Sequence, residues 1–158
     1  MGSKIKEKFR KGLFIVTYAV TKKGIKYLIL KRKLHWKGWE FPKGGLTGIK
    51  ERILEKKAVK REIIEETGLI PIKIKKFSYS GRYRYKKKLK DRPGIIGQTF
   101  KLYAVEVKKS KVNLKKNPDK EHSDYKWLEF EKALKKLTWP NQKKCLKIVN
   151  EYLSKKFK

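Results

Sequence analysis

Three glutamates within five residues are the part of this sequence best suited to chemistry. Glu62, Glu65 and Glu66 stand at i, i+3 and i+4 in segment 53–67, which has no proline or glycine and is predicted to be a helix ending before Gly68. At this spacing the carboxylates share one helix face, where like charges repel by roughly a few tenths of a kcal/mol per pair. A cation would offset that repulsion. Oxygen ligands without nearby cysteine or histidine favour Mg²⁺ or Mn²⁺ over zinc.

A solvated charged helix is the alternative interpretation of this segment, because lysines are interspersed with the glutamates. These lysines are Lys56, Lys57 and Lys60. The preceding loop favours a binding site instead. Two adjacent glycines, Gly44 and Gly45, permit positive φ and close approach of a ligand to the backbone, and Lys43 adds an ammonium group beside their amides. Together, this loop and the acidic helix predict a site for phosphate and a metal ion.

The loop and helix together resemble the Nudix box, which reads Gly, five residues, Glu, seven residues, then Arg-Glu-apolar-x-Glu-Glu-x-Gly-apolar. The second half matches at every position from Arg61 to Leu69. In the first half, five residues separate Gly45 from Glu51, but nine residues then separate Glu51 from Arg61. The connection is therefore two residues longer than the family pattern, or three if it is counted from Gly44.

This resemblance implies roles for the charged residues of the box. In the family the later glutamates carry the metals, here Glu62, Glu65 and Glu66, and the first glutamate helps to hold the arginine, here Arg61. Because of the longer connection, either Glu51 or Glu55 is expected to take that holding role. Glu55 qualifies because it lies seven residues before Glu62, on nearly the same helical face.

The composition is that of one globular domain. The 158 residues, 39% of them hydrophobic, are expected to form a single domain, 1–158, with a basic N-terminal extension at 1–10. No apolar run approaches the ~18 residues of a membrane span, so no membrane partner is expected. Cys145 is the single cysteine, which precludes an intrachain disulfide and indicates a reducing, cytoplasmic location. Whether the protein is a monomer or a homodimer is left open.

The second unusual feature is a net charge of +31. A charge of this size attracts polyanions and makes nucleic acid a candidate partner. However, seven of the 46 basic residues are arginines and the other 39 are lysines spread along the chain. An RNA-binding groove usually concentrates charge and uses arginine. A compositional bias, as in some thermophiles, is the other explanation.

Hydrophobic periodicity predicts an α+β chain. Strands are expected at 12–21, 26–31, 72–80, 81–85, 98–107 and 125–128, and helices at 53–67, 130–137 and 141–155. A basic loop is expected at 86–97. This order agrees with what the resemblance implies, a Nudix α/β/α sandwich with a mixed central sheet, the box helix and a C-terminal helix.

Two further segments are similar to the asymmetrical diadenosine tetraphosphate hydrolases within this family. Residues 39–44, Trp-Glu-Phe-Pro-Lys-Gly, resemble their Pro-Lys-Gly approach, and 121–128 resembles their Glu-His-x-x-aromatic-x-Trp-Leu segment. The likeness extends over about 12–153. It implies that Lys43, with Gly44 and Gly45, contacts the polyphosphate of a nucleotide substrate.

The same likeness implies roles for three residues outside the box. Tyr85 would stack on adenine, with a core aromatic as the alternative. Glu121 would be an additional metal ligand or a base, so that the catalytic set becomes Arg61, Glu62, Glu65, Glu66 and Glu121. His122 would touch phosphate or make a structural hydrogen bond.

The leading function implied is Mg²⁺-dependent hydrolysis of diadenosine tetraphosphate to ATP and AMP. Removal of diphosphate or a cap from RNA 5′ ends is a second enzyme hypothesis, which would use the positive charge directly. Damaged nucleotides and nucleoside diphosphate sugars remain alternative substrates. A catalytically weak RNA-binding Nudix module is a hypothesis from another class, prompted by the altered first half of the box.

Overall fold

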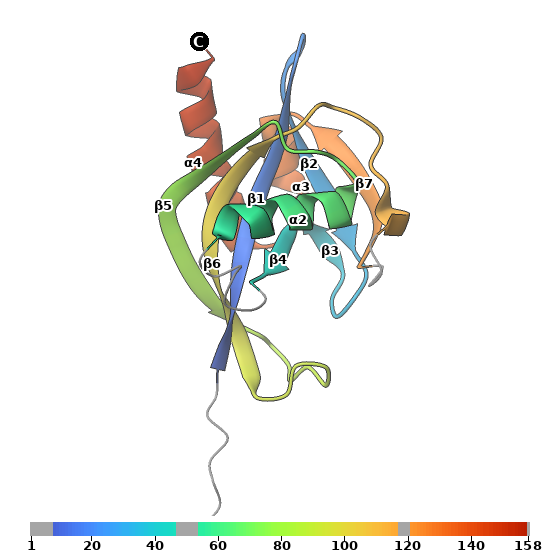
Figure 1. The fold of residues 1–158 in the computed structure, drawn as a ribbon, viewed down its shortest axis with the longest axis vertical. Coiled ribbons are helices and arrows are strands. Elements are labelled where there is room, and N and C mark those ends of the chain that lie inside the picture. The colour runs from blue at the N-terminus through green and yellow to red at the C-terminus, as the bar shows by residue number, and fades with distance from the viewer. Residues whose placement is uncertain (1–7, 47–53, 117–120, 158) are drawn as a thin grey trace, which may run out of the picture.

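A seven-stranded mixed sheet is covered by helices on both faces (Figure 1). The computed structural model describes residues 8–46, 54–116 and 121–157. The strands are β1 (Lys8–Thr21), β2 (Gly24–Arg32), β3 (Gly38–Glu40), β4 (Lys43–Gly45), β5 (Lys73–Arg84), β6 (Ile95–Glu106) and β7 (His122–Leu128). The helices are α2 (Glu55–Thr67), α3 (Phe130–Lys136) and α4 (Pro140–Lys156), with a short 3₁₀ helix, η1, at Leu114–Lys116. The predicted α+β sandwich with a mixed sheet is confirmed.

The long strand β1 organises the sheet. The strand order is β3-β2-β1-β6-β5, while β4 also pairs with β1 and β7 with β2. The β1–β6 pair is parallel and the other pairs are antiparallel. The parallel register places Arg10 opposite Gln98, and the antiparallel register places Phe14 opposite Lys43. Residues distant in sequence therefore meet near the N-terminal half of β1.

Alternating side chains of β1 divide the core into two layers, as the two-residue period of a strand requires. Leu13 and Ile15 pack with the apolar side of α2. Phe14 and Val16 point to the opposite face and pack with α3 and α4. α2 is therefore anchored on one face of the sheet, and its remaining surface is available for the site. No helix in the described ranges is long and apolar enough to cross a membrane.

The acidic helix ends as expected. Gly68 follows α2 with φ of 74°, the left-handed conformation that glycine adopts without steric cost, and its N–H donates to the Ile64 carbonyl. At the other end, Leu54 provides no side-chain cap. Of the predicted segment 53–67, Ile53 lies outside the described residues.

Several strands are longer than predicted, because backbone pairing extends them into polar sequence. β1 begins at Lys8 and β6 at Ile95, and these two residues pair with each other. Residues 8–10 thus belong to the sheet and not to an N-terminal extension, and 95–97 are not loop. The predicted strands 72–80 and 81–85 form one strand, β5, whose register is irregular between Lys76 and Ser80.

Candidate active site

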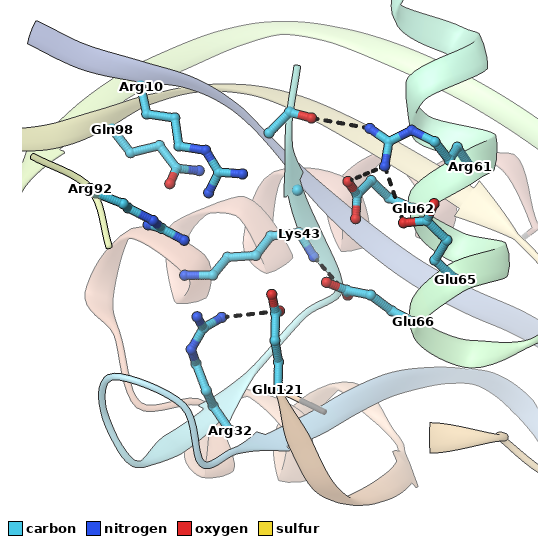
Figure 2. A pocket seen from close by; sticks show the side chains of 12 residues that line it. Arg10, Arg32, Lys43, Arg61, Glu62, Glu65, Glu66, Arg92, Gln98 and Glu121 are labelled. Atoms are coloured by element: carbon cyan, nitrogen blue, oxygen red, sulfur yellow. Dashed lines mark hydrogen bonds and ion pairs between the residues drawn. The ribbon is translucent and has the colours of Figure 1, made fainter. Parts of the chain in front are cut away.

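The carboxylates of α2 line a cavity of about 180 Å³ (Figure 2). Glu62 and Glu66 are buried, whereas the side chain of Glu65 is 47% exposed. Glu121, the residue immediately before β7, also lines this cavity. We call these four residues the acidic wall. The structure therefore brings Glu121 together with the three box glutamates, as the sequence predicts.

Arg61 connects the acidic wall to β4. Its Nη1 donates to Glu62 Oε1 at 2.8 Å and to Glu65 Oε2 at 3.1 Å. Its Nη2 donates to the Gly45 carbonyl at 3.2 Å. Arg61 thus holds two carboxylates and fixes α2 against the strand that carries Lys43.

The prediction that Glu55 could hold Arg61 is wrong. The carboxylate of Glu55 instead accepts hydrogen bonds from Lys76 at 3.0 Å, Lys101 at 2.7 Å and Tyr103 at 2.8 Å. The reason is position along the helix: Arg61 follows Glu55 by six residues, which advance by about 9 Å and do not return to the same face. Glu51, the other candidate, lies outside the described residues.

The two glycines before the helix are needed for space and not for a special backbone conformation. Neither Gly44 nor Gly45 has positive φ, which corrects the expected reason, and both belong to β4. A Cβ at Gly44 would collide with the Glu62 carboxylate, and one at Gly45 with the Arg10 guanidinium. The Lys43 backbone N–H donates to Glu66 Oε2 at 3.3 Å. The predicted loop at 43–45 is therefore the strand β4, and the absence of side chains at its two glycines lets Glu62 and Arg10 pack against its backbone.

Burial makes the acidic wall unfavourable without a cation. For Glu62, burial has the largest effect and raises the pKa of the carboxyl to about 7, although Arg61 opposes the shift. Burial also raises the pKa of Glu66 well above its usual range, and Glu62 and Glu121 raise it further. Close carboxylates with raised pKa values are a favourable environment for a positive ion.

Basic side chains form the opposite side of the cavity, which we call the cationic wall. It consists of Arg10, Arg32, Lys43 and Arg92. Figure 2 shows the Lys43 side chain extending across the middle, away from α2 and towards the arginines. The cavity therefore joins carboxylates that suit a metal ion to cations that suit phosphate.

Lys43 is held in place by a buried anion and by aromatic rings. Its Nζ lies 3.4 Å from Glu40 Oε1, and 4.9 Å and 5.8 Å from the ring centroids of Trp36 and Trp139. Burial lowers the pKa of Lys43, although Glu40 opposes this effect. The predicted phosphate-binding lysine thus lines the cavity with its ammonium already oriented.

Glu40 is the centre of a buried charge network. Its Oε2 lies 3.0 Å from Arg32 Nη1 and 2.9 Å from His122 Nε2. Burial alone would raise the pKa of Glu40, but Lys43, His122 and Arg32 together lower it to about 2. Arg32 Nη1 also lies 3.6 Å from Glu121 Oε2. The network therefore couples the two walls.

His122 makes a structural hydrogen bond, the second of its two predicted roles. Its Nε2 faces Glu40, and the residue does not line the cavity. Its Nδ1 is buried and has no hydrogen-bond partner within the described part of the chain. One ligand atom from each of Glu66, Glu121 and His122 lies within 4.8 Å of the others.

Tyr85 belongs to an aromatic group beside the cationic wall. Its hydroxyl accepts a hydrogen bond from Arg92 Nη1 at 2.7 Å. Its ring centroid lies 6.0 Å from that of Trp36 and 6.1 Å from that of Tyr83. Tyr85 does not itself line the cavity, but its hydroxyl contacts Arg92, which does.

Sequence patterns did not identify several residues of the site. These residues are Arg10, Arg32, Trp36, Glu40, Arg92, Gln98 and Trp139. Glu40 had a signal, a carboxylate in an apolar segment beside the predicted phosphate-binding Lys43. The arginines had none, because they are scattered among 46 basic residues.

The donor set of the acidic wall fits a divalent cation. Glu62, Glu65, Glu66 and Glu121 offer hard oxygen ligands, burial and the neighbouring carboxylates raise the pKa of Glu66, and one ring nitrogen of His122 lies within 4.8 Å of ligand oxygens of Glu66 and Glu121. The predicted ligands are thus brought together, three from α2 and Glu121 from the residue before β7.

Divalent cation should stabilise the protein more at high pH than at low pH. In metal-free protein the folded state keeps protons on Glu62 and Glu66 that the unfolded state releases, so stability falls as pH rises from the usual carboxyl pKa towards 7. A cation competes with those protons. We expect Mg²⁺ to raise Tm by several degrees at about pH 8 and by much less at about pH 5.5. Thermal denaturation with and without Mg²⁺ measures this, and equal shifts at both pH values would contradict it.

Comparisons with known proteins agree with this fold. The NUDIX domain family profile matches residues 9–147. The fold is similar to that of an Ap4A hydrolase from C. elegans, with a TM-score of 0.71 and 21% identity over 92% of this chain and 98% of that one. It is also similar to the NUDIX domain of Shewanella oneidensis NrtR complexed with ADP ribose, with a TM-score of 0.70 and 16% identity over 97% and 94% of the two chains. For the E. coli dihydroneopterin triphosphate pyrophosphohydrolase the TM-score is 0.69, with 17% identity over 87% and 94%.

No match was found among curated protein sequences. The structural likenesses show a shared fold, and the family profile covers most of the chain. The match includes the acidic wall, Arg61 and Lys43. The chain therefore belongs to the NUDIX domain family and is a pyrophosphohydrolase.

Proposed function

We propose that this protein hydrolyses dinucleoside polyphosphates, with diadenosine tetraphosphate cleaved to ATP and AMP, and that Mg²⁺ (or Mn²⁺) is its cation. The main support is the cavity itself, in which the acidic and cationic walls face each other. The sequence segments 39–44 and 121–128, and the fold similarity to the C. elegans Ap4A hydrolase, support the choice of substrate.

The acidic wall is the proposed place of bond cleavage. Glu62, Glu65, Glu66 and Glu121 would hold the divalent cation, with one ring nitrogen of His122 within 4.8 Å of ligand oxygens of Glu66 and Glu121. When bound, such a cation neutralises phosphate oxygens and lowers the pKa of a coordinated water. Arg61 keeps Glu62 and Glu65 in position through its 2.8 Å and 3.1 Å contacts and acts as a positioning residue.

The cationic wall would bind the phosphates and stabilise the negative charge that leaves with the product. Lys43 is the residue best placed for this, because Glu40 and the rings of Trp36 and Trp139 hold its ammonium at the cavity. Fixed charges of this kind stabilise a phosphoryl transition state without reorganisation. Arg32 Nη1, 3.6 Å from Glu121 Oε2, adds positive charge next to the acidic wall.

A carboxylate of the acidic wall would accept the proton of the attacking water. A carboxyl with a pKa near the working pH is best suited to this role. Glu62, whose pKa is raised by burial, and Glu121 are the two candidates.

The aromatic group next to the cationic wall is the proposed nucleoside site. Trp36 lies 6.0 Å from Tyr85 and 6.1 Å from Trp139, measured between ring centroids. Such rings stack on adenine. Tyr85 keeps its predicted role here as a member of this group, and the free, buried Cys145 is consistent with the proposed cytoplasmic location.

Hydrolysis at RNA 5′ ends is the second candidate. It is favoured by the row of exposed basic side chains on the edge strand β5, which includes Lys73, Lys75, Lys76 and Arg84. These side chains would attract the RNA backbone in a salt-dependent manner.

A substrate panel separates these functions. Purified protein with Mg²⁺ should convert diadenosine tetraphosphate to ATP and AMP at least about tenfold faster than it cleaves 5′-triphosphorylated RNA or an NDP-sugar. Products are resolved by ion-exchange chromatography. Preferential release of diphosphate from RNA would favour the second candidate. No turnover of any substrate, combined with tight salt-sensitive RNA binding, would instead indicate a binding module.

A further inference from the structure

Arg10 places an uncompensated positive charge at the cavity. It lies in β1 opposite Gln98, and its guanidinium rests against Gly45, where a Cβ would collide with it. Its side chain makes no hydrogen bond or ion pair with the described residues 8–46, 54–116 and 121–157. The group is nevertheless half-buried and lines the cavity. A buried arginine normally has an anionic partner, because burying an unpaired charge is costly.

Arg92 brings a second guanidinium to the same side. It comes from the segment between β5 and β6, and its Nη1 donates to the Tyr85 hydroxyl at 2.7 Å, which is a neutral partner. Figure 2 shows Arg10, Arg92 and Gln98 grouped together. Two like charges in a partly buried cavity repel each other, and a bound anion would convert that repulsion into attraction.

This group lies across the cavity from the carboxylates of α2. In Figure 2, Glu62, Glu65 and Glu66 lie on the other side of the cavity, and Lys43 extends between the two groups. A diphosphate cleaved at the acidic wall would engage Lys43 first. Arg10 and Arg92 would then be reached only by phosphates further along the chain.

We propose that Arg10 and Arg92 form a subsite for phosphates beyond the cleaved linkage, which makes the enzyme select substrates with three or more consecutive phosphates. This inference rests on the proposed hydrolysis at the acidic wall. The chemistry recognised is a run of phosphates, which either a dinucleoside polyphosphate or a 5′-triphosphorylated RNA can supply. Arginine suits it because its planar guanidinium binds phosphate oxygens in pairs.

The test compares substrates of different phosphate number in Arg10→Gln and Arg92→Gln. We expect kcat/KM for diadenosine tetraphosphate, and for triphosphorylated RNA if it is cleaved, to fall about tenfold to a hundredfold in each variant. Cleavage of ADP-ribose, which has two phosphates, should change by less than about threefold. Lys147→Gln, which removes one positive charge from the exposed face of α4, is the matched control. It should leave kcat/KM unchanged for both the long and the short substrates. Equal losses on long and short substrates would overturn the proposal.

A binding measurement separates failure of the subsite from failure of the proposed function. Isothermal titration of Mg²⁺-loaded protein with inorganic diphosphate and tripolyphosphate needs no turnover. Wild-type protein should bind tripolyphosphate more tightly, and Arg10→Gln should remove most of that difference while keeping the wild-type Tm. Arg10→Lys, which retains the charge but not the paired donors, should be intermediate.

If wild-type protein binds both anions equally, the subsite is absent, whatever substrate is cleaved. If the difference is present but diadenosine tetraphosphate is not cleaved, the subsite stands and the proposed substrate is wrong.

Discussion

Replacing Glu66 with glutamine should reduce kcat by roughly two to three orders of magnitude without destabilising the fold. Glu66 is 3% exposed, and burial together with Glu62 and Glu121 raises its pKa. Glutamine retains the shape and an oxygen that can accept the Lys43 backbone N–H. It removes the negative charge that a divalent cation needs. Metal-free Tm at neutral pH should therefore be unchanged or higher, while the increase produced by Mg²⁺ should largely disappear.

Glu151→Gln is the matched control for this substitution. Glu151 is 72% exposed on α4 and pairs with Lys155 at 3.4 Å, far from the cavity in the fold. Its loss should leave both kcat and the Mg²⁺ effect on Tm unchanged. If Glu66→Gln retained activity within a few-fold of wild type, the acidic wall would not be the place of cleavage.

Replacing Glu40 with glutamine should have the largest effect on stability, lowering the free energy of unfolding by about 3 kcal/mol or more. Glu40 is fully buried and lies within 3.0 Å of Arg32, 3.4 Å of Lys43 and 2.9 Å of His122. A neutral amide would leave the buried Lys43 without its counter-charge and Arg32 with only the carboxylate of Glu121, 3.6 Å away. Guanidinium chloride unfolding measures the loss, and the denaturant slope should be unchanged because the fold is the same.

Glu40 should also determine part of the pH dependence of folding stability. Its pKa is lowered to about 2 in the folded state, so its contribution is fully present above the unfolded carboxyl pKa of 4.5 and is lost as pH falls towards 2. Glu40→Gln should remove that part of the acid sensitivity. Glu129→Gln, at an exposed position 3.9 Å from Lys132, is the control and should change stability by less than about 0.5 kcal/mol. A loss below about 1 kcal/mol in Glu40→Gln would mean that its partners rearrange freely.

Local periodicity was a sound guide to the site. The spacing of Glu62, Glu65 and Glu66 predicted one acidic helix face, and Gly68 predicted where the helix ends. Both follow from helix geometry over a few residues, and such geometry hardly depends on the rest of the chain.

Strand ends and pairings were predicted less well. Lys8–Lys11 has no apolar pattern, yet it pairs with β6 through its backbone. Two adjacent glycines after a lysine usually form a turn and therefore predict a loop at 43–45, where the structure has the strand β4. Side-chain patterns report burial, whereas these segments are held by backbone hydrogen bonds to a partner that the local sequence does not reveal.

The sequence by itself determined the acidic helix, the adjacent Lys43 and the class of reaction. Tertiary structure alone decided that Glu55 faces Lys76 and Lys101, that Glu40 neutralises Lys43, and that Arg10 reaches the cavity. Residues 10 and 98 become neighbours only through the parallel β1–β6 register. That register is set by packing across the whole sheet, and a shift of one residue would turn each side chain to the opposite face.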